Sequence, residues 1–218
     1  MNKILEPSIL GFYKENLMEE INKVKEIGIN TIHFDIMDSY VNNIAFDIEH
    51  IQPILDIGLK INVHTMVWEP LKWLESLSKF NISSYTFQYE AIDEKSVFEC
   101  LEFLKKQKFM GGIAIRPDSK FIDYSKFLDY CEIVTIMTVI PGKGGQKFMI
   151  EGVENLIDVF KYKQEKNKNL KIEIDGGINL DNIPLIIDKV DYVVSGSNFA
   201  NSNQKDKQKM IHLVMNNT

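Results

Sequence analysis

Hydrophobic residues recur along the chain with two spacings, one typical of strands and one typical of helices. In the segment 31–37, apolar and polar side chains alternate, which predicts a β-strand with Ile32, Phe34 and Ile36 on one face. The segment 12–27 instead places apolar residues three to four positions apart, which predicts an amphipathic helix that ends before Gly28. Both spacings repeat in turn along the rest of the chain.

Eight strands and eight helices are predicted in alternation. The strands are expected at residues 4–10, 31–37, 60–67, 84–88, 112–115, 133–139, 170–174 and 192–194. The helices are expected at residues 12–27, 47–57, 71–80, 93–106, 122–130, 151–164, 182–189 and 205–215. Strands that alternate with helices pair in parallel and are covered by those helices. Eight such units that close on themselves predict an α/β fold, the TIM (β/α)8 barrel.

Length and composition agree with this architecture. The 218 residues, 44% of them hydrophobic, predict a single barrel domain over residues 1–218. The alternative is an open doubly wound sheet, which is disfavoured because no G-x-G-x-x-G sequence follows the first strand.

The polar face of the second strand carries candidate metal ligands. His33, Asp35 and Met37 project together there, and His64 and Asp175 lie near the ends of the third and seventh strands. Either histidine alone is more simply explained as a core residue satisfied by the backbone. In a barrel, however, the chemistry lies at the carboxyl ends of the strands, so these side chains are predicted to meet. Two imidazoles and two carboxylates favour one divalent transition metal, zinc, iron, manganese or cobalt.

Glycine-containing turns suggest an anion site beside that metal. They occupy residues 141–146, 175–179 and 195–198, after the last three strands, where barrels commonly bind phosphate through backbone N–H groups. A metal and two carboxylates near a phosphate site suit proton abstraction next to a metal-polarised carbonyl of a phosphosugar. Asp35 and Asp175 come from opposite sides of the barrel mouth, so one could accept a proton while the other donates one to the opposite face. Met37, Met66 and Met137 at the strand ends are either core filler or an apolar lining of this pocket.

Charge and composition exclude several other classes of function. The formal net charge of -6 and the lack of a long basic block argue against a nucleic-acid partner. No apolar run reaches membrane-spanning length and no secretory signal is recognisable, so a cytoplasmic protein without a membrane partner is expected. Cys100 and Cys131 lack metal-ligand spacing and are expected to be buried free thiols.

Taken together, the motifs resemble the ribulose-phosphate 3-epimerase family over nearly the whole chain. They are PSIL at 7–10, HFDIMD at 33–38, VHTMV at 63–67, TFQYEA at 86–91, MTVIPGKGGQ at 137–146, EIDGG at 173–177 and SGS at 195–197. The resemblance implies that His33, Asp35, His64 and Asp175 bind the metal. It further implies that Asp35 accepts and Asp175 donates the proton, in a reaction that interconverts D-ribulose 5-phosphate and D-xylulose 5-phosphate in the pentose phosphate pathway. The substrate contacts that it implies are Ser8, His64, Gly142, Lys143, Gly144, Gly145, Asp175, Gly176, Gly177, Gly196 and Ser197.

The chain departs from the family pattern at five positions outside the implied metal and acid/base set, namely Ser39, Gln88, Arg116, Ile140 and Lys143. These departures leave a 3-epimerase of another ketose phosphate, such as D-allulose 6-phosphate, as an alternative. A non-catalytic phosphosugar-binding barrel is the alternative from another class of function. A decarboxylase of related sequence is disfavoured, because Met37 stands where its lysine would lie. The helices of a barrel also allow assembly into a homo-oligomer, which no residue pattern decides.

Overall fold

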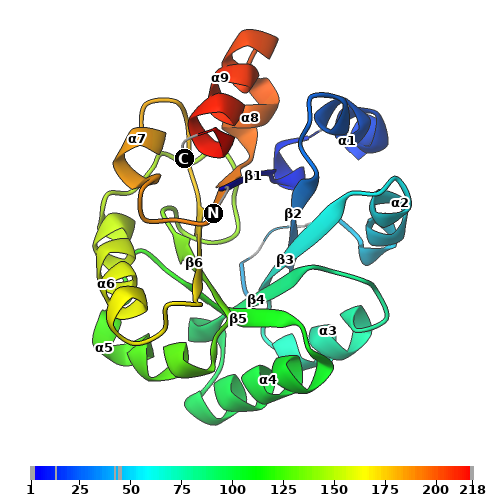
Figure 1. The fold of residues 1–218 in the computed structure, drawn as a ribbon. Coiled ribbons are helices and arrows are strands. Elements are labelled where there is room, and N and C mark those ends of the chain that lie inside the picture. The colour runs from blue at the N-terminus through cyan, green and yellow to red at the C-terminus, as the bar shows by residue number, and fades with distance from the viewer. Residues whose placement is uncertain (1–2, 13, 42, 44–45, 217–218) are drawn as a thin grey trace.

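A computed structural model describes residues 3–12, 14–41, 43 and 46–216 as a barrel of parallel strands surrounded by helices (Figure 1). The strands are β1 (Ile4–Pro7), β2 (Thr31–Met37), β3 (Lys60–Met66), β4 (Ser84–Gln88), β5 (Met110–Ile115), β6 (Ile133–Met137), β7 (Lys171–Asp175) and β8 (Tyr192–Ser195). The helices are α1 (Leu17–Glu26), α2 (Ile51–Asp56), α3 (Pro70–Leu77), α4 (Glu94–Gln107), α5 (Phe121–Tyr124), α6 (Glu151–Glu165), α7 (Ile183–Ile186), α8 (Ser197–Asn201) and α9 (Gln204–Met215).

The order of the strands confirms the barrel prediction. Each strand pairs in parallel with its neighbours in the order β1-β8-β7-β6-β5-β4-β3-β2. An isolated parallel bridge between Ser8 and His33 joins the end of β1 to β2 and brings the two edges of the sheet together. The open doubly wound sheet is therefore ruled out.

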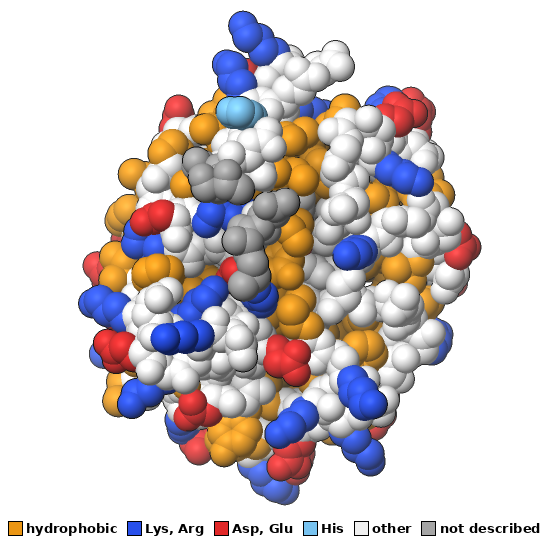
Figure 2. All heavy atoms as spheres, in the orientation of Figure 1, with side chains coloured by type: hydrophobic (Ala, Val, Ile, Leu, Met, Phe, Trp, Pro, Cys, Tyr) orange, Lys and Arg blue, Asp and Glu red, His pale blue; other side chains and the backbone are white. Residues whose placement is uncertain are grey.

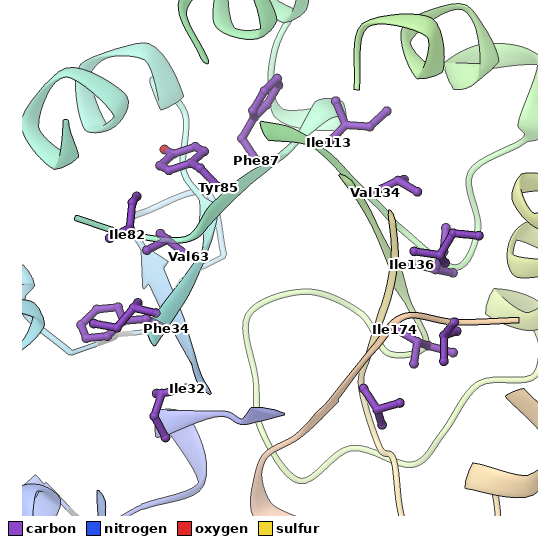
Figure 3. Close-up of a cluster of buried hydrophobic side chains, with 14 of the residues drawn as sticks. Ile32, Phe34, Val63, Ile82, Tyr85, Phe87, Ile113, Val134, Ile136 and Ile174 are labelled. Atoms are coloured by element: carbon purple, nitrogen blue, oxygen red, sulfur yellow. The ribbon is translucent and has the colours of Figure 1, made fainter. Parts of the chain in front are cut away.

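The apolar core lies between the strands and the helices, outside the barrel. Ile32, Phe34, Tyr85 and Ile174 are almost completely buried, and Figure 3 shows such side chains directed away from the centre of the ring of strands. Because side chains alternate along a strand, the residues between them point into the barrel. The interior therefore receives polar groups, which are Glu6, His33, Asp35, Asn62, His64, Thr86, Gln88, Thr135 and Glu173.

Several elements differ from those predicted. The first strand ends at Pro7, because the Ser8 hydroxyl accepts a hydrogen bond from the Leu10 N–H and caps a short 3-10 turn. The first predicted helix begins only at Leu17, and its predicted residue Tyr13 lies outside the described residues. The segment 122–130 is mostly a 3-10 helix, and the short helix α8 was not predicted.

The surface carries charge of both signs, and the thiols agree with the expectation from composition. Figure 2 shows positive and negative side chains interspersed around one face of the molecule, with hydrophobic side chains between them. Cys100 and Cys131 are free and buried, as predicted. Within the described part of the chain, no helix has the length and apolar character that a bilayer crossing requires.

Candidate functional site

Four side chains from three strands converge at the carboxyl end of the barrel. His33 and Asp35 extend from β2, His64 from β3 and Asp175 from the end of β7. The His33 Nε2 atom lies 3.4 Å from Asp35 Oδ1 and 3.9 Å from Asp175 Oδ2. The His64 Nδ1 atom lies 3.5 Å and 3.9 Å from the same two oxygens. The structure thus brings together the residues that the sequence predicted to meet.

This arrangement fits a metal better than a hydrogen-bonded cluster. The distances between the imidazole nitrogens and the carboxylates exceed normal hydrogen-bond lengths, and His33 Nε2 and His64 Nδ1 have no hydrogen-bond partner among the described residues. All four ligand atoms lie within 4.8 Å of one another. Metal–ligand distances of about 2.0–2.2 Å place neighbouring ligands of a tetrahedral ion roughly 3.3–3.6 Å apart, close to the spacing observed. The cluster can therefore hold a divalent transition metal.

The two carboxylates of the cluster differ in environment. Asp35 accepts a hydrogen bond of 2.8 Å from the Ser8 hydroxyl. Burial alone would raise the pKa of Asp35, but the neighbouring imidazoles of His33 and His64 outweigh it and hold that pKa below its usual value. Burial raises the pKa of Asp175 to about 6, and the negative charge of Asp35 acts in the same direction. The site thus favours an ionised Asp35 beside a more readily protonated Asp175.

A second group of buried polar residues, which the sequence analysis missed, lies on the other side of His33. The His33 Nδ1 atom is 3.7 Å from Glu6 Oε2 and 3.8 Å from Glu173 Oε2. Asn62 donates a hydrogen bond to Glu6, and Thr135 donates one to Glu173. The signal was present in the alternation of the strands, since Glu6 and Glu173 each stand two positions before a predicted site residue. Both carboxylates can act as acceptors for the second nitrogen of His33.

The second ring nitrogen of His64 contacts another residue that the sequence analysis did not assign to the site. Its Nε2 atom lies 2.9 Å from Gln88 Oε1, and the Gln88 amide donates to Glu90 Oε2 at 2.8 Å. Glu90 lies in the short 3-10 turn after β4 and is partly buried. Burial raises the pKa of Glu90, and hydrogen bonds from Ser119 and the Arg116 N–H act against that increase. Gln88, noted only as a departure from the family pattern, is thus in contact with a candidate metal ligand.

A pocket opens above the cluster at the barrel mouth, and nearly all predicted substrate contacts line it. Met37, Met66 and Met137 form part of its wall. The remaining predicted residues on the wall are Ser8, Asp35, Gly142, Lys143, Gly144, Gly145, Asp175, Gly176, Gly177, Gly196 and Ser197. His33 and His64 lie deeper and are completely buried. The wall also includes Leu10 and Val139, as well as Gln146 and Asn198 from the predicted glycine turns.

Two glycines after β7 allow the chain to turn at the pocket wall. Gly176 and Gly177 have φ angles of +123° and +64°, which side chains rarely adopt. A Cβ atom on Gly177 would also lie 2.6 Å from the backbone nitrogen of Phe148. This close approach packs the loop after β7 against the loop after β6. Both positions therefore require glycine whatever ligand the pocket takes.

The loop after β6 is braced at the pocket mouth. The Gln146 side-chain amide donates hydrogen bonds of 2.7 Å to the carbonyl oxygens of Ile140 and Lys143. Asn43, from the segment after β2, donates one of 2.6 Å to the Gly142 carbonyl. The loop can therefore present its backbone and the exposed Lys143 side chain to a ligand. The other departure with a charged side chain, Arg116, is paired with Asp118 instead.

Comparisons of the sequence with known proteins agree with this geometry. A sequence profile of the ribulose-phosphate 3 epimerase family matches residues 4–200. A protein named ribulose-phosphate 3-epimerase in Mycoplasma genitalium is 34% identical over 86% of this chain and 87% of its own length. Proteins of the same name in Encephalitozoon cuniculi and Bacillus subtilis are 34% and 32% identical and cover 92% and 94% of this chain, and 89% and 94% of their own lengths.

Solved structures with low sequence identity support the fold alone. A tryptophan synthase structure from Mycobacterium tuberculosis superposes with a TM-score of 0.69 at 11% identity, covering 98% of this chain and 90% of that chain. A tryptophan synthase α-subunit from Pyrococcus furiosus gives a TM-score of 0.67 at 13% identity, covering 98% and 99% of the two chains. These similarities extend the (β/α)8 architecture to proteins of distant sequence.

Proposed function

Because the chain belongs to the ribulose-phosphate 3 epimerase family and is an enzyme of the isomerase class, we propose that it interconverts D-ribulose 5-phosphate and D-xylulose 5-phosphate. The observation that carries this proposal is the convergence of two imidazoles and two carboxylates on one buried centre beneath a glycine-lined pocket. The proposal includes a divalent transition metal, zinc, iron, manganese or cobalt, held by His33, Asp35, His64 and Asp175. When bound, this ion supplies positive charge beside the sugar oxygens on which negative charge develops.

The phosphate and the sugar would occupy different parts of the pocket. The backbone N–H groups around Gly176, Gly177 and Gly196 would hold the phosphate, because glycines allow an anion to approach the chain closely. The sugar would extend from there toward the carboxylates, where Ser8 and His64 lie beside Asp35. The methionine side chains would exclude water from the reacting carbon without supplying protons of their own.

Two carboxylates on separate strands provide the proton transfers that an epimerisation needs. Asp35 extends from β2 and Asp175 from β7, so each can reach a different face of the sugar carbon C3. In the proposed direction, Asp35 accepts the C3 proton and Asp175 donates one to the opposite face, which inverts the configuration. The Ser8 hydroxyl would keep the Asp35 carboxylate in position through its hydrogen bond. The lowered pKa of Asp35 keeps its carboxylate ionised, which is the form that an acceptor needs before the proton is transferred.

The structure also bears on the alternatives, which differ in substrate and in chemistry. A larger ketose such as D-allulose 6-phosphate would use the same carboxylates and would be selected at the pocket mouth, where Lys143 lies. A receptor without catalysis would need a phosphate site but no pair of buried carboxylates. The paired Asp35 and Asp175 therefore favour an enzyme.

The experiment is an assay of the purified protein with a panel of ketose phosphates in deuterated water. We expect ribulose 5-phosphate to give xylulose 5-phosphate with deuterium at C3, and chelation to abolish the reaction. Asp175→Asn should remove turnover, whereas Asp188→Asn, the same change at an exposed site, should not. Full turnover by Asp175→Asn would contradict the two-carboxylate scheme. Binding of the sugar without exchange at C3 would favour the receptor, and preference for a hexulose would redefine the substrate.

A further inference from the structure

A chain of hydrogen bonds runs from His64 to the loop after β5. His64 Nε2 contacts the Gln88 carbonyl oxygen at 2.9 Å, and the Gln88 amide nitrogen donates to Glu90 Oε2 at 2.8 Å. The other oxygen of Glu90 accepts hydrogen bonds from the Arg116 N–H at 2.7 Å and from the Ser119 hydroxyl at 2.5 Å. Glu90 is thus surrounded by three donors, on elements that pack around the end of β4.

The chemistry of these groups determines which one donates and which one accepts in each of these hydrogen bonds. An ionised carboxylate only accepts hydrogen bonds, so the Gln88 side chain must turn its NH2 group toward Glu90. The Gln88 carbonyl then faces His64, and a carbonyl oxygen only accepts. His64 Nε2 must therefore carry the proton that it donates. A neutral imidazole has one N–H, which leaves Nδ1 with a free lone pair.

That lone pair lies where the proposed metal would use it. His64 Nδ1 has no hydrogen-bond partner among the described residues and is 3.5 Å from Asp35 Oδ1. Metal-binding histidines generally donate their second nitrogen to an acceptor that fixes the tautomer and the orientation of the ring. We propose that Gln88 and Glu90 are positioning residues that hold His64 as the Nε2–H tautomer, with its Nδ1 directed at the metal centre. This inference rests on the proposed function, because it assigns the metal to that centre.

The decisive variant is Glu90→Gln. It reverses the donor and acceptor roles along this series of hydrogen bonds and keeps the size and shape of the side chain. The Arg116 N–H can only donate, so the carbonyl of the new glutamine must stay beside it and its NH2 group must face Gln88. Gln88 would then turn its own carbonyl toward that NH2 group and its NH2 group toward His64. Since an NH2 group cannot accept, His64 Nε2 would become the acceptor and the proton would move to Nδ1.

Two measurements read out this reversal, and one of them needs no metal. Ring nitrogen chemical shifts of the neutral His64 ring in the metal-free protein report which nitrogen is protonated. We expect Nε2–H in the wild type and Nδ1–H in Glu90→Gln. Competition with a chromophoric chelator measures Zn²⁺ affinity, which should fall roughly 10–100-fold in Glu90→Gln.

The matched control is Ser119→Ala. It removes one donor to Glu90 but leaves the Glu90 carboxylate and the direction of the hydrogen bonds through Gln88 to His64. It should keep the wild-type tautomer and a Zn²⁺ affinity within about threefold. Gln88→Leu, which removes the acceptor altogether, should give a mixture of tautomers. If Glu90→Gln keeps the Nε2–H tautomer and binds Zn²⁺ as the wild type does, the inference is wrong. If the tautomer reverses but the wild type itself takes up no divalent ion, the proposed metal site fails and the control of the His64 tautomer stands.

Discussion

The two ends of the barrel treat charged groups in opposite ways. At the amino ends of the strands, Asp191 accepts hydrogen bonds from Lys163 at 2.6 Å and from the Ile172 N–H at 2.9 Å. Lys3 donates to the carbonyl oxygens of Ile187 and Val190 at the same end. At the carboxyl ends, His33 and His64 have buried nitrogens without a partner among the described residues. At the amino ends the charged groups pair with one another. At the carboxyl ends the imidazoles and carboxylates point toward a common centre.

The difference indicates where stability and where function reside. Leaving a buried polar atom without a hydrogen bond costs roughly 1–3 kcal/mol, so several such atoms together indicate a place where a ligand can satisfy them. Polar groups that satisfy one another, as Asp191 and Lys163 do, stabilise the fold and need no ligand. Substitutions at the two ends should therefore separate activity from stability.

The largest effect is expected from Asp35→Asn. Removing the acceptor carboxylate should lower kcat by roughly 10²–10⁴-fold, as expected for the loss of a general base. The free energy of unfolding of the metal-free protein should also fall, because the lowered pKa of Asp35 means that the folded state stabilises its charge through the neighbouring imidazoles. Steady-state kinetics and urea denaturation with chelator present measure both quantities. A large loss of stability together with full activity would mean that Asp35 serves the stability of the fold and not its function.

The next effect is the response to a divalent metal. At a free metal concentration 100 times its dissociation constant, the wild type should gain about 2.7 kcal/mol of unfolding free energy, because only the folded state holds the ligands together. For a chain of this size, that gain corresponds to a rise in Tm of roughly 5–10 °C. Thermal melts with Zn²⁺ and with chelator measure it. Asp35→Asn should lose most of the rise, whereas a substitution of Asp191 should keep it.

A smaller effect with the opposite signature is expected from Asp191→Asn. The substitution weakens hydrogen bonds from Lys163 and Ile172, so it should cost about 1–3 kcal/mol of unfolding free energy while kcat stays unchanged. Burial alone would raise the pKa of Asp191, but Lys163 and the Ile172 N–H outweigh it and hold that pKa below its usual value.

The pH dependence of this effect has a defined sign. Because the pKa of Asp191 is lower in the folded state, its stabilisation is complete above the unfolded pKa of about 3.9 and is lost as the pH falls through the folded value. Urea denaturation at several pH values should therefore show a constant gap between wild type and Asp191→Asn from pH 7 to pH 5. The gap should close below about pH 4. A gap that persists at low pH would show that the charge of Asp191 is not what stabilises this end.

The convergence of the four candidate metal ligands could be predicted from the sequence because each one obeys a local rule. Alternation places His33 and Asp35 on the same face of β2, and the barrel topology places them beside His64 and Asp175 at the carboxyl ends of the strands. The glycine turns could be predicted in the same way, because they come directly after the last three strands. These features depend on spacing within one segment and on a fold that repeats.

The supporting groups could not be assigned in the same way, because their roles depend on contacts between strands. Glu6 and Glu173 flank one nitrogen of His33 only because β1, β2 and β7 face a common interior. Gln88 contacts His64 because of the register that pairs β3 with β4, and the spacing of residues 84–88 gives no sign of that contact. Periodicity identifies which side chains point inward, whereas the closed barrel decides which of them meet.

The smallest predicted effect concerns Lys143, whose exposed side chain lines the pocket mouth. An exposed cation near a phosphate contributes at most about 1 kcal/mol, so Lys143→Ala should raise KM by up to roughly fivefold and leave kcat unchanged. The increase should shrink as salt is added, because salt screens exposed charges. Lys147→Ala, an exposed lysine of the same loop outside the pocket wall, is the matched control and should leave KM unchanged. Equal increases in both variants would mean that the loop attracts the phosphate through its overall charge and that Lys143 makes no specific contact.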